Sequence, residues 1–221
     1  VSARAADLAS RPYEAADATL PPSFDRLDYD AYRKLRPAPE RAQWRAPGEP
    51  FAILPLPRGG LFRDRVRLHL VEAGAPRTLE TIAPFVDFVD FPAASEAERG
   101  ALGSSGLRVL APFGEAEPGP ELLVMQGASY FRALAPGLVY GLSARALAVD
   151  GLAGAQGGDE EFPRFTDLWV SRPEPGDTSL TIAALIDGPS LAGAYEMAIR
   201  PGPDATVMDV RAVLHARRVL D

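Results

Sequence analysis

Glycine and proline interrupt this chain so often that little room is left for long helices. The sequence holds 20 glycines and 22 prolines in 221 residues. Glycine weakens regular elements through its backbone freedom, and proline lacks an N–H group to donate. Between them lie short alternating runs such as residues 65–70, which read Arg-Val-Arg-Leu-His-Leu. A period of two is typical of half-buried strands, so the chain is predicted to be all-β, a large β-sandwich with few short helices.

The same reasoning predicts the other strands. They are expected at residues 107–110, 122–126, 129–134, 139–142, 144–149, 168–172, 180–186, 195–199 and 207–217. In the last of these, Val210, Ala212 and Leu214 share one face of the strand. Short helices are expected at residues 2–8, at 28–35 with Asp28 as N-cap, and after a capping box of Ser95 and Glu98. The proline-rich residues 10–23 and 37–50 are expected to wrap over the sandwich in extended form.

Composition and motifs exclude several classes of function. The net charge of -7 argues against a nucleic-acid partner, since phosphate binding needs a basic surface. No apolar run reaches the ~18 residues that a membrane span needs. There is no cysteine, and His69 and His215 look isolated on polar strand faces, so we expect no metal site. We also expect no cofactor, because phosphate-binding glycine loops are absent from the sequence.

The segment from Gly127 to Trp169 combines aromatic rings and arginines, which suits a neutral sugar. Apolar ring faces can stack on the C–H surface of a sugar, and planar guanidinium groups can fix its hydroxyls. Tyr130 and Arg132 point to one face of strand 129–134 and are predicted to bind substrate. Alternatively, they are a cross-strand aromatic and a surface charge.

Two further pairs are candidates for the same site. Tyr140 and Arg145 flank the turn at Gly141, which either places them in a cleft or forms an ordinary hairpin. Glu161 and Arg164 are close enough for an ion pair, which suits orienting sugar hydroxyls better than donating a proton. The alternative is a structural ion pair in a loop.

Trp169 completes the set of predicted substrate-binding residues. It is either a stacking platform or, as is commoner in a sandwich, a core residue. None of the serines fits a nucleophile elbow, because the run Gly141-Leu142-Ser143 has no closing glycine. We identify no catalytic residue in the sequence.

Several blocks of this sequence resemble the periplasmic glucan biosynthesis protein G and D family. The motifs GASYFR, YGLSAR and EEFPRF occur in the family's order, and further matching blocks lie at residues 20–36, 60–72, 180–195 and 201–210. Two stretches depart from the family: LGSSGL replaces an aromatic-rich run at residues 102–107, and the turn at 151–158 is unusually rich in glycine. Family members also continue far past Asp221.

The resemblance implies a fold and a domain organisation. It implies a supersandwich like that of galactose mutarotases, of which residues 20–221 would be the N-terminal portion. Residues 1–19 would form an N-terminal helix and extended segment, and the C-terminal immunoglobulin-like domain of the family would be absent. A missing C-terminal domain or a partner chain would then complete the protein.

The resemblance also implies a function. It implies a periplasmic protein that binds a β-glucan polysaccharide with a β-1,2-linked glucose backbone, although the chain starts at Val1 without a signal peptide. The family includes β-1,2-glucan hydrolases, whose catalytic acids would lie beyond the matched blocks, so we expect a partial or shortened member without the full catalytic pair. Three alternatives remain: an active β-1,2-glucan hydrolase, a structural scaffold that binds no sugar, and a mutarotase-like epimerase.

Overall fold

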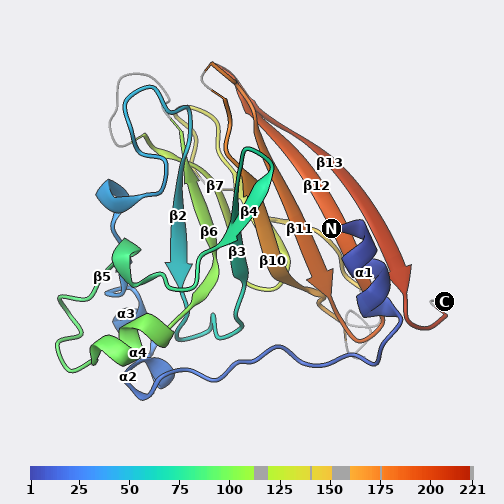
Figure 1. Cartoon of the computed structure of the whole chain (residues 1–221), viewed down its shortest axis with the longest axis horizontal. Helices are drawn as coiled ribbons and strands as arrows, with labels where there is room; N and C mark the ends of the chain where they lie inside the picture. The colour runs from blue at the N-terminus through green and yellow to red at the C-terminus, as the bar shows by residue number, and fades with distance from the viewer. Residues whose placement is uncertain (112–118, 140, 151–159, 175, 220–221) are drawn as a thin grey trace.

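The protein folds as two β-sheets packed face to face, with short helices near one end and the N-terminal helix against the larger sheet (Figure 1). The structure is a computed structural model, and it describes residues 1–111, 119–139, 141–150, 160–174 and 176–219. The predicted all-β sandwich is confirmed. None of the helices among these residues is long and apolar enough to span a membrane.

The larger sheet has six strands in the order β13-β12-β11-β10-β3-β4. Their bounds are β3 Arg67–Glu72, β4 Ala75–Thr78, β10 Arg164–Ser171, β11 Leu180–Asp187, β12 Leu191–Pro201 and β13 Thr206–Ala216. Neighbours pair antiparallel except β10 and β3, which pair in parallel with Leu168 opposite Leu68. Strands that are about 100 residues apart in the sequence therefore lie side by side at the centre of this sheet.

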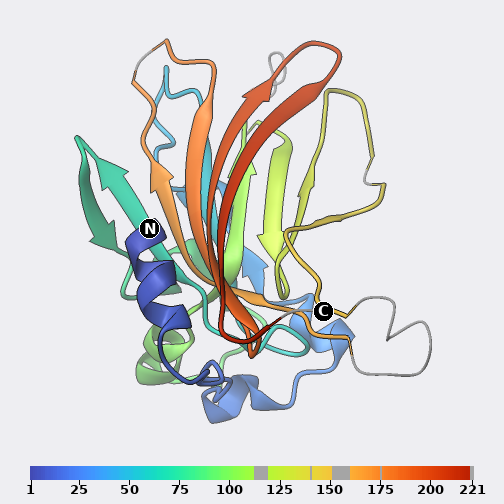
Figure 2. The ribbon, with the colours of Figure 1, turned by 90° about the vertical axis from the view of Figure 1, so that its right-hand side faces the viewer.

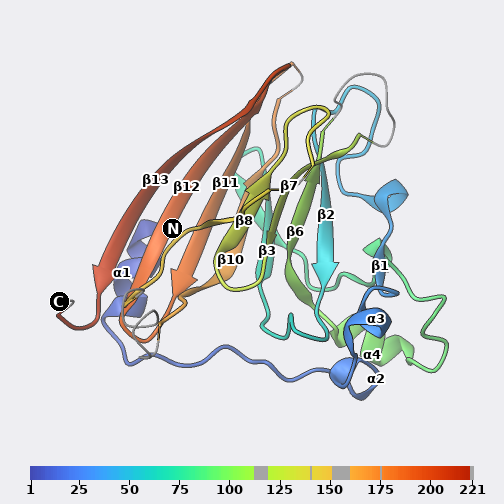
Figure 3. The ribbon, with the colours of Figure 1, turned by 180° about the vertical axis from the view of Figure 1, so that it is seen from behind.

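The smaller sheet has five strands in the order β2-β6-β7-β8-β9, seen from behind in Figure 3. Their bounds are β2 Ala52–Pro57, β6 Ser104–Leu110, β7 Glu121–Gln126, β8 Tyr130–Ala133 and β9 Ala144–Arg145. A two-stranded ribbon joins β1, Arg36–Pro37, to β5, Val86–Asp87.

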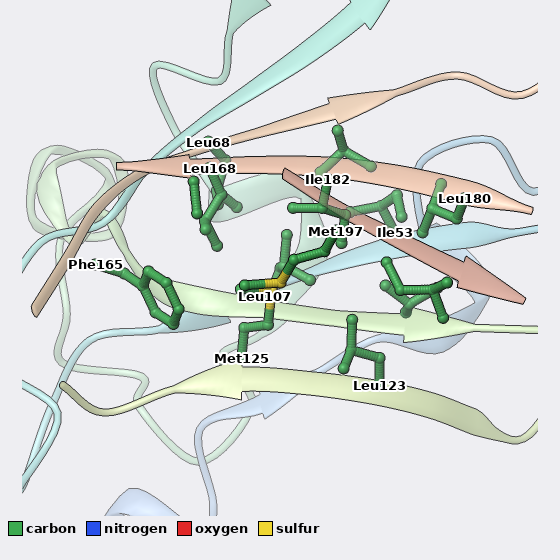
Figure 4. Close-up of a cluster of buried hydrophobic side chains, with 14 of the residues drawn as sticks. Ile53, Leu68, Leu107, Leu123, Met125, Phe165, Leu168, Leu180, Ile182 and Met197 are labelled. Carbon is green, nitrogen blue, oxygen red and sulfur yellow. The ribbon is translucent and has the colours of Figure 1, made fainter. Parts of the chain in front are cut away.

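The core lies between the two sheets (Figure 4). Leu123 and Met125 of the smaller sheet face Leu168, Ile182 and Met197 of the larger one, and all five are fully buried. Alternation explains this arrangement, because every second residue of a strand points to the same face. Burial of these apolar side chains is the main stabilising term of the fold.

The helices are short, and three of the four were predicted. They are α1 Ser2–Ala9, α2 Pro22–Asp25, α3 Tyr29–Tyr32 and α4 Glu96–Ala101. Asp28 caps α3 through the N–H of Ala31, and Ser95 forms the expected capping box with Glu98. Single-turn 3-10 helices occur at η1, Pro39–Arg41, and η2, Ala83–Phe85. Between α1 and α2 the chain runs in extended form along the base of the sandwich (Figure 1).

Some strand predictions were wrong. Residues 139, 141 and 142 are not in a strand, and the expected strand at 144–149 is reduced to β9 and a single bridge at Val149. The sequence reading missed β2, since Pro55 and Pro57 argue against a strand. The sheet tolerates them because β2 is its terminal strand, and proline is accepted at such an edge.

Candidate functional site

Strand β8 places Tyr130 and Arg132 on the outer face of the smaller sheet. Phe131 points the other way and packs against the core. Tyr130 lies opposite Arg145 of β9, and Arg132 lies opposite Val124 of β7. The predicted common face of Tyr130 and Arg132 is therefore confirmed, and it brings Arg145 alongside.

A hollow of about 420 Å³ opens over this face. It is lined by Leu61, Phe62, Val124, Gln126, Gly127, Ala128, Tyr130, Phe131, Arg132, Ser143 and Arg164. Gly127 has a φ of +79°, and a Cβ there would lie 3.1 Å from the ring of Phe62. Glycine at this turn therefore lets Phe62 close one side of the hollow. Leu61, which is 88% exposed, forms its lip.

Arg145 sits between two aromatic rings at the edge of the hollow. Its guanidinium carbon lies 5.5 Å from the centre of the Tyr130 ring and 4.7 Å from that of Phe162. Glu160 pairs with the same guanidinium group. These contacts fix the Tyr130 ring and the Arg145 donors in one orientation, which a stacking site requires.

The predicted ion pair between Glu161 and Arg164 is wrong. Arg164 instead pairs with Asp64, on the turn before β3. Glu161 accepts hydrogen bonds from the backbone N–H and the hydroxyl of Ser190, at 3.0 and 2.5 Å. The partners of Glu161 and Arg164 are therefore set by contacts in the folded protein and not by closeness along the chain. At Gly188 an added Cβ would lie only 2.7 Å from Oε1 of Glu161, so a glycine admits the carboxylate to the β11–β12 turn.

A half-buried polar network borders the hollow at Gln126, and the sequence reading did not identify it. The amide of Gln126 donates to Tyr32 Oη at 2.9 Å and to Ser105 Oγ at 2.8 Å, while the Tyr32 hydroxyl donates to the carbonyl of Pro57. Burial raises the pKa of Tyr32 to about 12. The partners come from four separate segments, so no local pattern could have revealed the network.

Trp169 lies away from the hollow, on the outer face of the larger sheet. Its ring stacks on His69 with centroids 4.6 Å apart, and the guanidinium of Arg4 lies 5.1 Å from its centre. The ring packs beside α1. The structure therefore does not bring Trp169 together with Tyr130 and Arg132.

The expectation that His69 is isolated on a polar face is wrong. Its Nε2 lies 2.8 Å from Oδ1 of Asp167 and its Nδ1 lies 2.8 Å from Oγ1 of Thr78. Arg67 binds both oxygens of Asp167, which is fully buried. Burial alone would raise the pKa of Asp167, but hydrogen bonds from His69 and Arg67 hold it well below its usual range. The sequence could not reveal this cluster, because β3 and β10 meet only in the folded sheet.

Two sequence predictions concern residues outside the described ranges. These are Tyr140 and the glycine-rich turn at 151–158. Among the described residues, Arg132 donates to the hydroxyl of Ser143 from its Nε. This contact ties β8 to the segment that precedes β9.

The carboxylates described around the hollow are paired with arginine or accept hydrogen bonds from serine. Asp64 pairs with Arg164, Glu160 with Arg145, and Glu161 with Ser190. Within the described ranges, no group of three or more His, Cys, Asp or Glu side chains could hold a metal ion. The described residues in and beside the hollow thus combine aromatic rings with the arginines Arg132, Arg145 and Arg164 and the amide of Gln126, groups that can bind a polyhydroxylated ligand.

Comparison with known proteins gives a consistent set of matches. The family model described as periplasmic glucan biosynthesis protein, MdoG, matches residues 1–221. A glucans biosynthesis protein G from Rhodopseudomonas palustris is 44% identical over 213 residues, covering 96% of this chain and 41% of the relative. Proteins of the same name from Pseudomonas putida and Vibrio cholerae are 40% and 41% identical, with 38% of each relative covered. This chain spans about two fifths of the length of these relatives.

Proposed function

Because this chain belongs to the periplasmic glucan biosynthesis protein MdoG family, we propose that it acts in the biosynthesis of periplasmic glucans and binds the glucan in the hollow on the smaller sheet. Its location would then be the periplasm. The ligand we propose is a glucan with a β-1,2-linked glucose backbone. Residues 20–221 would form the N-terminal portion of a glucan-binding domain.

One observation carries this proposal. Tyr130, Arg132 and Arg164, from two different sheets, line a single hollow. Phe62 lines the same space from the turn before β3, so aromatic rings and two arginines converge there. A ring can stack on the apolar face of a glucose unit, while the guanidinium groups donate to its hydroxyls.

Each residue has a distinct proposed role. Tyr130 would stack on a glucose ring, with Arg145 holding the tyrosine in place from β9. Arg132 and Arg164 would donate hydrogen bonds to sugar hydroxyls, one from each sheet. Glu161 is tied to Ser190, so its proposed role is to position the strand that carries Arg164.

Titration calorimetry with linear β-1,2-glucan oligosaccharides tests this function, with β-1,3-glucan as the control ligand. We expect selective binding of the β-1,2-linked ligand and a loss of about tenfold in affinity for Tyr130→Ala, corresponding to ~1.4 kcal/mol. Tyr29→Ala is the matched control, because Tyr29 is exposed, lies under Arg33 and does not line the hollow. Equal affinities of both tyrosine variants would refute the assignment of the hollow.

We further propose that these residues do not hydrolyse the glucan by themselves. Hydrolysis needs one carboxyl group as acid and a second as base or nucleophile. The carboxylates described around the hollow are bound by arginine or serine, which favours binding over proton donation. Release of reducing ends from β-1,2-glucan by the purified chain would establish the alternative, an active hydrolase.

A structural scaffold is the second candidate, and one specific observation favours it. Apolar side chains are exposed along β13, where Val210 and Leu214 are each 46% exposed. Such a surface fits a module that needs additional structure before it can bind sugar. A melting temperature that rises with added glucan would favour binding, because a ligand of the native state stabilises it.

A further inference from the structure

A second hollow lies among the short helices near one end of the molecule. We term it the β5 hollow, after Val86, Asp87, Phe88 and Val89, which lie on or directly after β5 and line it together with residues of η1, η2 and α4. Its volume is about 750 Å³, within the range of about 300–1,000 Å³ that is typical of ligand sites. Seen from the side of β13, the green helix α4 lies at the foot of the sandwich (Figure 2). Among the described residues, this hollow and the one over β8 share no lining residue, so the two are separate.

One wall of the β5 hollow is an aromatic ring held in place from behind. The ring of Phe88 packs on that of Phe24, which is fully buried, with centroids 6.0 Å apart. Phe91 packs on the same buried ring at 5.7 Å. Beside Phe88 the wall continues with Val89, which is 75% exposed, and with Pro92. The hollow therefore presents a fixed apolar surface to solvent, and the C–H face of a ligand could cover it.

Two arginines face the same hollow with their guanidinium groups restrained. The guanidinium carbon of Arg99 lies 5.3 Å from the centre of the Phe88 ring, and its Nη2 donates to the carbonyl of Phe91 at 3.2 Å. Its Nε is buried and has no hydrogen-bond partner among the described residues. Arg41, on η1, donates to the carbonyl of Val86 at 3.4 Å. A guanidinium group has five N–H donors, so each arginine retains donors for a ligand in a restrained position.

Two carboxylates balance these arginines. Asp87 and Glu96 are exposed and line the hollow, and Oδ1 of Asp87 accepts the backbone N–H of Val89 at 3.0 Å. The charged side chains described in the lining are thus two arginines and two acids. An anionic ligand would face the acids, and a cationic ligand would face Arg41 and Arg99. The hydroxyls of a neutral sugar both donate and accept hydrogen bonds, so a sugar can use both kinds of group.

We propose that the β5 hollow is a second sugar-binding site, which takes a neutral glucose unit. The C–H face of the sugar lies against Phe88, and its hydroxyls accept from Arg41 and Arg99 and donate to Asp87 and Glu96. The site needs none of the residues around the hollow over β8. A glucan long enough to occupy both hollows would be held at two points, which raises its affinity without any new contact; only this consequence rests on the proposed function.

Nuclear magnetic resonance titration of the labelled 221-residue chain with a linear β-1,2-glucan oligosaccharide tests the proposal. The signals to follow at the β5 hollow are the backbone amides of residues 87–89 and the side-chain Nε–H of Arg99, whose burial slows its exchange with water. The backbone amide of Tyr130 reports on the hollow over β8. We expect the signals at the β5 hollow to shift with increasing sugar and to saturate.

Two variants at exposed positions of the β5 hollow sharpen the test. Arg41→Met removes a donor and Val89→Ser removes apolar contact, and both side chains are exposed, so the fold should persist. We expect each variant to bind sugar about fivefold more weakly at this hollow and to leave the Tyr130 titration unchanged. Arg77→Met is the matched control, because Arg77 is exposed on β4 and lines neither hollow.

Three outcomes would overturn the proposal. In the first, the signals at the β5 hollow stay still while that of Tyr130 shifts, which leaves the proposed glucan site intact. In the second, inorganic phosphate shifts the Arg99 Nε–H as strongly as the sugar does, which would identify an anion site. In the third, Arg41→Met and Val89→Ser both bind as the wild type does. Conversely, shifts confined to the β5 hollow would support the second site and contradict the proposed function, so the two failures are distinguishable.

Discussion

The guanidinium group of Arg145 lies over the ring of Tyr130, on the neighbouring strand and in direct register with it. The pair stands at the edge of the hollow, where a second ring, that of Phe162, lies still closer to the same guanidinium. A cation over an aromatic face contributes about 0.5–1 kcal/mol at an exposed site. Its main effect at this position is to restrict the orientation of the tyrosine ring.

Replacing Arg145 should therefore weaken sugar binding more than it weakens the fold. Arg145→Met keeps the chain length but removes the charge, and we expect about tenfold lower glucan affinity in calorimetry. The free energy of unfolding should change by less than ~1 kcal/mol, because a partly exposed ion pair contributes little. Arg33→Met is the matched control, since Arg33 covers Tyr29 outside the hollow. Unchanged affinity of the Arg145 variant would contradict the role assigned to this pair.

Tyr32 should make the fold sensitive to alkaline pH. Its pKa is about 12 in the folded protein and 10.0 unperturbed, because burial disfavours the phenolate. The contribution of the buried, protonated Tyr32 to the stability of the fold is fully present below pH 10. It is lost as the pH rises towards 12. The rise of the Tyr32 pKa from 10.0 to about 12 corresponds to about 3 kcal/mol.

Tyr32→Phe should abolish this part of the pH dependence. Urea denaturation at a series of pH values between 9 and 12 measures it, with Tyr29→Phe as an exposed control. At neutral pH the Tyr32 variant should also lose ~1–2 kcal/mol, because the amide of Gln126 loses Tyr32 Oη as an acceptor and the carbonyl of Pro57 keeps only the hydroxyl of Ser105 as donor. A variant that keeps the wild-type alkaline profile would rule out Tyr32 as the titrating group.

Glu98 should make the fold sensitive to acid. It accepts hydrogen bonds from Ser95 at the start of α4 and from the N–H and hydroxyl of Ser23 on α2. The backbone bond from Ser95, followed by those from Ser23, lowers the pKa of Glu98 to about 2 from 4.5. This stabilisation is present above pH 4.5 and is lost as the pH falls towards 2.

We expect Glu98→Gln to be less stable than the wild type at pH 7 and to show a flatter profile between pH 5 and 2. Thermal melts across this range measure the difference. Glu96→Gln serves as the control, because Glu96 lies in the same first turn of α4 but is not part of the capping box. The assignment fails if both variants follow the wild-type acid profile.

Substitution of Arg58 should lower the stability of the fold more than substitution of most other residues. It is fully buried, and its guanidinium donates to the carbonyls of Asp17, Arg63 and Leu102. Arg58→Met fills a similar volume but leaves three carbonyls without this donor. We expect a loss of about 3 kcal/mol or more in urea denaturation, because each unsatisfied buried polar group costs ~1–3 kcal/mol. Arg36→Met, at an exposed arginine, should change stability by less than ~0.5 kcal/mol.

The candidate site was predictable only in part. Alternation in β8 placed Tyr130 and Arg132 on one face, and this follows from the strand alone. The true partners of Glu161 and Arg164 were not predictable, because Ser190 and Asp64 lie 29 and 100 residues away. Tyr32 and Gln126 were missed for the same reason, being 94 residues apart.

The sequence by itself determined the local elements of this protein. Alternating runs define β3 and β11, and the capping box of Ser95 and Glu98 starts α4, because these features depend on neighbours along the chain. Only the tertiary structure decided which strands pair, such as β3 with β10, and which apolar face remains uncovered, such as that of β13. The physical reason is that strand pairing and side-chain burial depend on contacts between distant segments, which no local pattern encodes.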